Sequence, residues 1–102
     1  MVTKAEGYAS HAEGADTKAQ GYASHAEGAI TKAEGYASHA EGEYTIATGR
    51  AQHTQGKYNI IDNDNVYAHI VGNGTDDNSR SNAHTLDWNG NAWFAGDVAI
   101  GT

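Results

Sequence analysis

Small residues alternate with polar residues through the first half of the chain, and glycine recurs at every seventh position. It occupies Gly7, Gly14, Gly21, Gly28, Gly35, Gly42, Gly49 and Gly56. The segment 3–58 consists of four copies of a fourteen-residue unit: TKAEGYASHAEGAD, TKAQGYASHAEGAI, TKAEGYASHAEGEY and the divergent TIATGRAQHTQGKY. So regular a repeat predicts a repetitive architecture in which each copy forms the same local structure.

A period of seven also occurs in coiled coils, but that fold is excluded here. The positions that should carry large apolar residues hold Ala and Gly, and each Gly inside a helix costs about 1 kcal/mol relative to Ala. A parallel β-solenoid fits better, with one short strand and one turn per seven residues and one full turn of the coil per fourteen. Four stacked turns would be about 19 Å tall.

Alternation along each strand indicates which side chains lie inside the coil. In the stretch 10–14, Ser10, Ala12 and Gly14 share one face, whereas His11 and Glu13 share the other. Burying a column of carboxylates would be costly. We therefore expect the small face to point inward, giving a thin interior of Ala, Gly and hydroxyl groups.

The Ser-x-Ala-x-Gly pattern on a fourteen-residue period resembles the YadA-like head repeats of trimeric autotransporter adhesins over residues 3–58. This resemblance implies a left-handed parallel β-roll that forms a homotrimer, projects from a surface and serves attachment. The SHAEG form of the repeat, with the segments 71–75 and 82–94, is similar to tail-fibre and appendage proteins of phages and prophages. That similarity implies a location in a virion tail fibre or on another extracellular surface.

The seven-residue spacing stops near Tyr58, and the composition shifts to Asn, Asp and larger apolar residues. We expect a domain boundary there, followed by a β-structured cap or transition region at 59–102. Short strands are predicted at 59–61, 66–71 and 97–100. The Asn89-Gly90 pair predicts a hairpin between 84–88 and 91–95. We expect Trp88, Trp93 and Phe94 to form a small core in this region, with an exposed aromatic binding patch as the alternative.

Charge and composition exclude several functions. The net charge is −7, and nucleic acid calls for a basic surface. The sequence has no Cys and no apolar run long enough to insert into a membrane. Its first residues lack the charged and apolar regions of a signal peptide, so we do not expect one in this chain. No combination of residues indicates catalysis or a cofactor, so we do not expect an enzyme.

The equivalent histidines His11, His25, His39 and His53 are metal-ligand candidates, since each has Glu or Gln two residues later. We favour repetition of a surface residue instead, because a straight column does not supply the convergence that a four-ligand site needs. Calcium ligation by Asp62, Asp64, Asp76, Asp77 and Asp87 lacks the twelve-residue loop with its terminal Glu, and turn formation explains these residues better.

Two further columns invite functional interpretations. Thr3, Thr17, Thr31 and Thr45 could suggest an ice-binding array, but we expect their hydroxyls to satisfy backbone groups. Tyr8, Tyr22 and Tyr36, together with Trp88 and Trp93, are candidates for binding a glycan. We expect the three tyrosines to pack between turns or subunits.

These observations predict an all-β structural and attachment segment of a homotrimeric fibre that contacts a host-surface glycan or protein receptor. The alternatives are a glycan-binding module and a fragment of a bacterial adhesin head.

Overall fold

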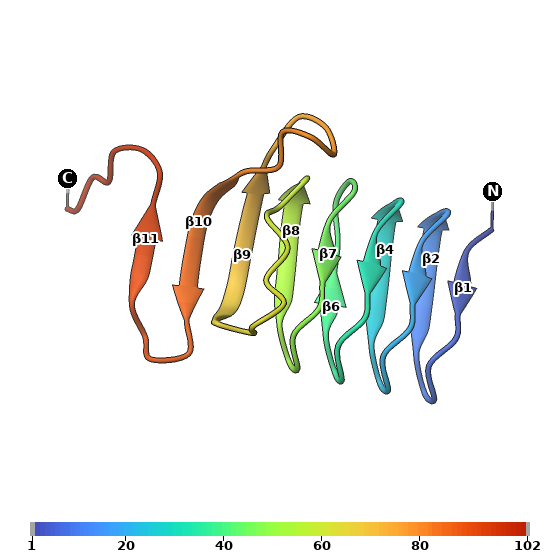
Figure 1. Ribbon diagram of the computed structural model, residues 1–102. Helices are drawn as coiled ribbons and strands as arrows, with labels where there is room; N and C mark the ends of the chain where they lie inside the picture. The colour runs from blue at the N-terminus through green and yellow to red at the C-terminus, as the bar shows by residue number, and fades with distance from the viewer. Residues whose placement is uncertain (1, 102) are drawn as a thin grey trace.

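The computed structural model describes residues 2–101 and shows an all-β chain whose first part is a β-solenoid, extending over 42 × 27 × 27 Å (Figure 1). Its strands are β1 (Lys4–Ala5), β2 (His11–Ala15), β3 (Lys18–Ala19), β4 (His25–Ala29), β5 (Lys32–Ala33), β6 (His39–Ala40), β7 (Ile46–Ala47), β8 (His53–Lys57), β9 (Tyr67–Asn73), β10 (Asn82–Asp87) and β11 (Ala92–Phe94). Within 2–101 there is no helix of the length and apolar character needed to cross a membrane.

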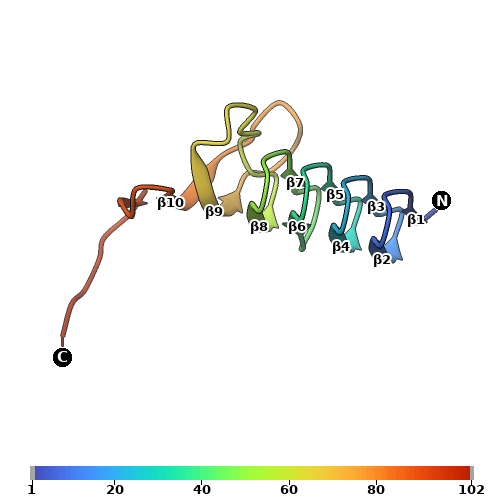
Figure 2. The same cartoon turned by 90° about the horizontal axis from the view of Figure 1, so that it is seen from below.

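Two parallel walls form the coil, and the chain passes from one to the other at each half-turn (Figure 2). One wall is the four-stranded sheet β1-β3-β5-β7, and the other belongs to a seven-stranded sheet in the order β11-β10-β9-β8-β6-β4-β2. Strands pair in a register of fourteen residues, so that His11 lies beside His25 and Lys4 beside Lys18. The fourteen-residue unit is therefore one turn of the coil, as expected.

Alanine side chains fill the space between the walls. Ala19, Ala26, Ala33, Ala40 and Ala47 are fully buried and form one cluster. Beside them lie the buried hydroxyls of Thr17, Thr31, Thr45, Ser24 and Ser38. The expectation of a small inward face is confirmed for Ser and Ala. It is wrong for Gly14, Gly28 and Gly42, which are exposed and have φ between 104° and 108°.

The glycines permit close approach between turns. A Cβ placed on Gly21 would lie 2.0 Å from the carbonyl oxygen of Gly35, which is far inside van der Waals contact. Two residues after each glycine, by contrast, the left-handed conformation falls on a residue that carries a side chain, such as Ala23 with φ 54° or Ile30 with φ 55°. Stacking of the backbones, and not only the bends of the chain, explains the glycine repeat.

The coil continues for one turn beyond the boundary expected near Tyr58. Strand β9 pairs parallel to β8, with His53 beside His69, so that five parallel strands are stacked in this wall. This turn has sixteen residues instead of fourteen. The strand expected at 59–61 does not form, because the side chain of Asn59 takes over its pairing: Oδ1 accepts from the Ile46 amide at 2.8 Å and Nδ2 donates to the Ile46 carbonyl at 3.1 Å.

After β9 the pairing becomes antiparallel, and β10 and β11 form the hairpin that Asn89-Gly90 predicts. The expected aromatic core is wrong: Trp88, Trp93 and Phe94 are 49%, 51% and 47% exposed. The hairpin extends the sheet as a single layer, with no second layer over these rings in residues 2–101. The strand expected at 97–100 is also absent, and after Phe94 the chain runs away from the sheet (Figure 2).

Candidate functional site

All six histidines of the chain lie in one line across the seven-stranded sheet, which we call the histidine ladder: His11, His25, His39, His53, His69 and His84. Parallel pairing in register places each imidazole of the repeats over its equivalent in the next turn. Neighbouring ring centroids lie 4.5–5.0 Å apart from the first to the fifth histidine. The line ends where the His84 ring stacks on Phe94 at 4.3 Å.

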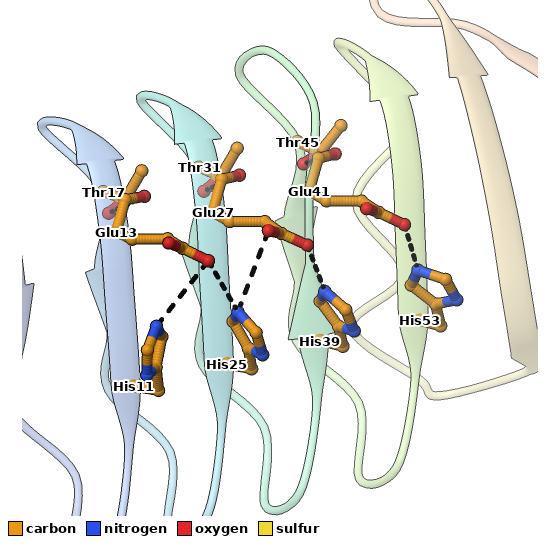
Figure 3. A network of polar contacts seen from close by, with 10 residues as sticks. All are labelled: His11, Glu13, Thr17, His25, Glu27, Thr31, His39, Glu41, Thr45 and His53. Carbon is orange, nitrogen blue, oxygen red and sulfur yellow. Dashed lines mark hydrogen bonds and ion pairs between the residues drawn. The ribbon is translucent and has the colours of Figure 1, made fainter.

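Carboxylates lie between the imidazoles of the repeats (Figure 3). Glu13 Oε1 is 3.7 Å from Nε2 of both His11 and His25. The next carboxylate, Glu27, reaches His39 Nε2 at 3.2 Å and lies 4.0 Å from His25. Each glutamate thus leans toward the following turn as well as toward the histidine of its own strand.

Farther along, the contacts become hydrogen bonds of ordinary length. His53 Nε2 donates to Glu41 Oε1 at 2.8 Å, and this hydrogen bond holds the pKa of the Glu41 carboxyl below its usual value. In the fourth copy Gln55 replaces glutamate, and its Oε1 lies 3.1 Å from Nε2 of His69, the fifth histidine of the ladder. Burial, with the neighbouring His53 and His84 imidazoles, lowers the pKa of His69. The electrostatic character of the ladder therefore changes along its length.

The sequence repeat identified the first four members of the ladder and missed His69 and His84. Because the fifth turn has sixteen residues, His69 falls outside the fourteen-residue spacing. His84 comes from an antiparallel strand, where its Nδ1 donates to the Trp93 carbonyl at 2.9 Å. The hairpin at Asn89-Gly90 placed His84 on a strand, but nothing in the sequence placed that strand beside β9.

The three tyrosine candidates stack on one corner of the coil. Tyr8, Tyr22 and Tyr36 have ring centroids 5.3 and 5.1 Å apart with nearly parallel planes, and the Arg50 guanidinium continues the column 4.7 Å from the Tyr36 centroid. The rings are 75%, 46% and 47% exposed. They pack between turns as expected, and they still present an aromatic edge to solvent.

The two tryptophans occupy different surroundings. Trp93 lines a cleft of about 440 Å³ with Ile60, Tyr67, Asn82, Thr85 and Asp87 among its other walls. The Trp88 indole instead donates from Nε1 to Asn65 Oδ1 at 3.2 Å, and it does not line this cleft. An aromatic floor beside amide and carboxylate groups is suited to a polar ligand with apolar faces, such as a sugar.

The threonine and aspartate candidates have structural roles. Thr17, Thr31 and Thr45 each donate from Oγ1 to a glutamate carbonyl within the coil at 2.8–3.1 Å. Asp62 Oδ2 accepts from Gln52 Nε2 and from the Tyr67 amide. Three of the other aspartate candidates hold turns: Asp76 accepts from the Asn78 amide, Asp77 from Arg80, and Asp87 from the amides of Asn89 and Asn91.

Comparison of the chain with known protein families, curated proteins and solved structures gives no significant match.

Proposed function

We propose that this chain is a structural and attachment segment of a homotrimeric fibre, in which three left-handed β-rolls lie side by side. The fibre would belong to a phage or prophage tail or to another extracellular surface, such as a bacterial adhesin head. The observation that carries the proposal is the apolar surface that one chain leaves uncovered at its C-terminal hairpin: Ile60, Val66, Trp88, Trp93 and Phe94 are all 47–51% exposed.

The coil itself has little apolar material with which to compensate for this exposure. Its buried cluster consists only of alanines, and Ile70 is the one large aliphatic side chain fully buried within residues 2–101. Covering the exposed half of three aromatic side chains would remove about 300 Å² from water, which corresponds to about 7 kcal/mol per chain. A gain of that size supports association of copies of this chain, because the free energy gained must offset the loss of translational and rotational freedom on association.

Mass in solution tests the proposal. We expect light scattering after gel filtration to give three times the mass of one chain, and Trp93→Ser to shift the population toward monomer. Tyr22→Ser is a matched control, because it removes an aromatic ring of similar exposure from the opposite part of the chain and should leave the trimer intact. A stable monomer at micromolar concentration would refute the fibre.

Recognition of a host-surface glycan is a second candidate function, favoured by the cleft beside Trp93 and by the exposed tyrosine column. It predicts binding on a glycan array. Binding lost on Asn91→Ala would assign the cleft, because Asn91 lines it without belonging to the exposed apolar surface. Binding lost on Tyr22→Ala would assign the column, and both assignments require that the mass in solution is unchanged. A silent array would leave the chain a spacer that positions other parts of the fibre.

A further inference from the structure

Three overlapping groups on the histidine ladder each place two imidazoles and one carboxylate within metal-binding reach. The ligand atoms within each group lie within 4.8 Å of one another. We propose that the first group, formed by His11, Glu13 and His25, binds one divalent transition-metal ion, with zinc as the reference ion. All three ligands come from one chain, so the site does not require the trimer.

The geometry of this group is close to that of a bound zinc ion. Ligand atoms at about 2.0–2.2 Å from zinc in a tetrahedral arrangement stand about 3.4 Å apart. Glu13 Oε1 lies 3.7 Å from Nε2 of His11 and of His25, so each of these two separations needs to shorten by only a few tenths of an ångström. The ligand atoms of the two imidazoles lie within 4.8 Å of each other, and rotation of the exposed His11 side chain can bring them closer. Water would complete the fourth position, as in sites with three protein ligands.

The donors of this group are also free of competing contacts. Within residues 2–101 neither His11 Nε2 nor the Glu13 carboxylate makes a side-chain hydrogen bond, and no Lys or Arg forms an ion pair with Glu13. His25 Nε2 is shielded from solvent and has no hydrogen-bond partner in the same range. A buried nitrogen without a partner is unfavourable, and a metal ion would satisfy it.

In each of the other two groups, a hydrogen bond already joins one imidazole nitrogen to the carboxylate. His39 Nε2 lies 3.2 Å from Glu27 Oε1, and His53 Nε2 lies 2.8 Å from Glu41 Oε1. Each of these nitrogens carries the proton that it donates to the carboxylate, and an ion would have to displace that proton. The second group also shares His25 with the first, so the two cannot be filled independently.

The relative orientation of the imidazole rings also distinguishes the first group from the other two. The His11 and His25 planes are inclined by 53°, whereas His25 and His39 are inclined by 7° and His39 and His53 by 23°. The nitrogen lone pair lies in the plane of its ring, so parallel rings direct their lone pairs side by side, and inclined rings can direct them to one point. The exposed His11 and Glu13 side chains can adjust without disturbing the coil.

Imidazole nitrogen combined with one carboxylate is a donor set for zinc, nickel or copper, whereas calcium prefers oxygen ligands. The experiment is isothermal titration of the full, untagged chain with Zn²⁺ and, separately, with Ca²⁺. We expect one Zn²⁺ per chain and no Ca²⁺ binding. His11→Gln and Glu13→Gln should each weaken Zn²⁺ binding at least tenfold. The matched control His53→Gln, at the same register three turns farther along, should change it less than twofold.

A second readout locates the ion. In an NMR spectrum that correlates imidazole nitrogens with their ring protons, the resonances of His11 and His25 should move on adding Zn²⁺, and those of His53 and His69 should not. Because His11 lies on an edge strand and is exposed, His11→Gln is expected to keep the β circular dichroism of the parent chain. Absence of Zn²⁺ binding, equal binding of Ca²⁺, or equal weakening by His11→Gln and His53→Gln would each overturn the assignment.

Discussion

Replacing Gly35 by alanine should disrupt the stacking of turns at one corner of the coil. The added Cβ would lie 2.1 Å from the Gly49 carbonyl oxygen and 2.5 Å from its carbon. Restoring ordinary contact requires the two turns to separate by more than about 1 Å, which would stretch three hydrogen bonds between them. The Glu34 and Gly35 amides donate to the Ala47 carbonyl at 2.8 and 3.2 Å. The Ala51 amide donates to the Tyr36 carbonyl at 2.7 Å.

Three weakened hydrogen bonds at about 0.5–1.5 kcal/mol each give a loss of about 2–4 kcal/mol in unfolding free energy. For a domain of this size that loss lowers Tm by about 10–25 °C, which thermal unfolding followed by circular dichroism at one fixed protein concentration would measure. Ala37→Gly is the matched control, two residues away. Ala37 has a φ of 54°, a conformation that costs a residue with a Cβ about 1–2 kcal/mol.

Glycine removes that cost and adds entropy to the unfolded chain worth about 0.4–1 kcal/mol. We therefore expect Ala37→Gly to raise the unfolding free energy by up to about 1 kcal/mol. The two substitutions should act in opposite directions although they lie in the same turn. A Tm for Gly35→Ala within 3 °C of the parent chain would refute the role of the glycines in backbone stacking.

Three further substitutions test other parts of the chain. Gln52 is fully buried, and its side-chain amide makes four hydrogen bonds. Gln52→Ala should lower the unfolding free energy measured in urea by on the order of 3 kcal/mol, and Gln55→Ala should lower it by less than about 1 kcal/mol. Thr54 Oγ1 is buried with no hydrogen-bond partner in residues 2–101, so the isosteric Thr54→Val should stabilise by about 1 kcal/mol; a loss of stability would indicate an unrecognised partner. Hydrogen bonds, chiefly from the Asn91 amide, hold the pKa of Asp87 below its usual value. The hairpin should therefore keep this stabilisation at pH values above the usual pKa range of a carboxyl group and lose it as pH falls through the lowered pKa of Asp87. A shift of the hairpin amide resonances over this pH range would report the loss, and Asp87→Asn should abolish the shift.

The repeat made most of the coil predictable from the sequence. Register, strand positions and the inward Ser24 and Ala26 follow from a fixed period and from alternation, since every copy must occupy an equivalent environment. The fifth turn could not be predicted from the repeat, because hydrogen bonds of single side chains hold it in place. Gln52 stands where earlier copies have Ser, and Asn59 stands where they have Thr, and each makes long-range hydrogen bonds that no local pattern encodes.

The candidate site was predictable only as a column of residue types. The sequence showed that His11 and His25 must be neighbours, but not that Glu13 leans between them or that their ring planes differ. Those features depend on side-chain rotamers and on position near the end of the coil. The aromatic core expected around Trp93 failed for a related reason: an apolar composition indicates burial, but it does not say whether the covering surface lies in the same chain.

The equal spacing of the repeated turns affects how the length of this protein can change during evolution. The first four turns contact one another through the same glycine-to-carbonyl approach and the same fourteen-residue register. A gene that lost or duplicated one unit would therefore encode a chain with every column still aligned, shorter or longer by about 4.8 Å. Length is the property most easily altered by recombination between the near-identical copies, and the hairpin would be carried along unchanged at a new distance from the N-terminal end.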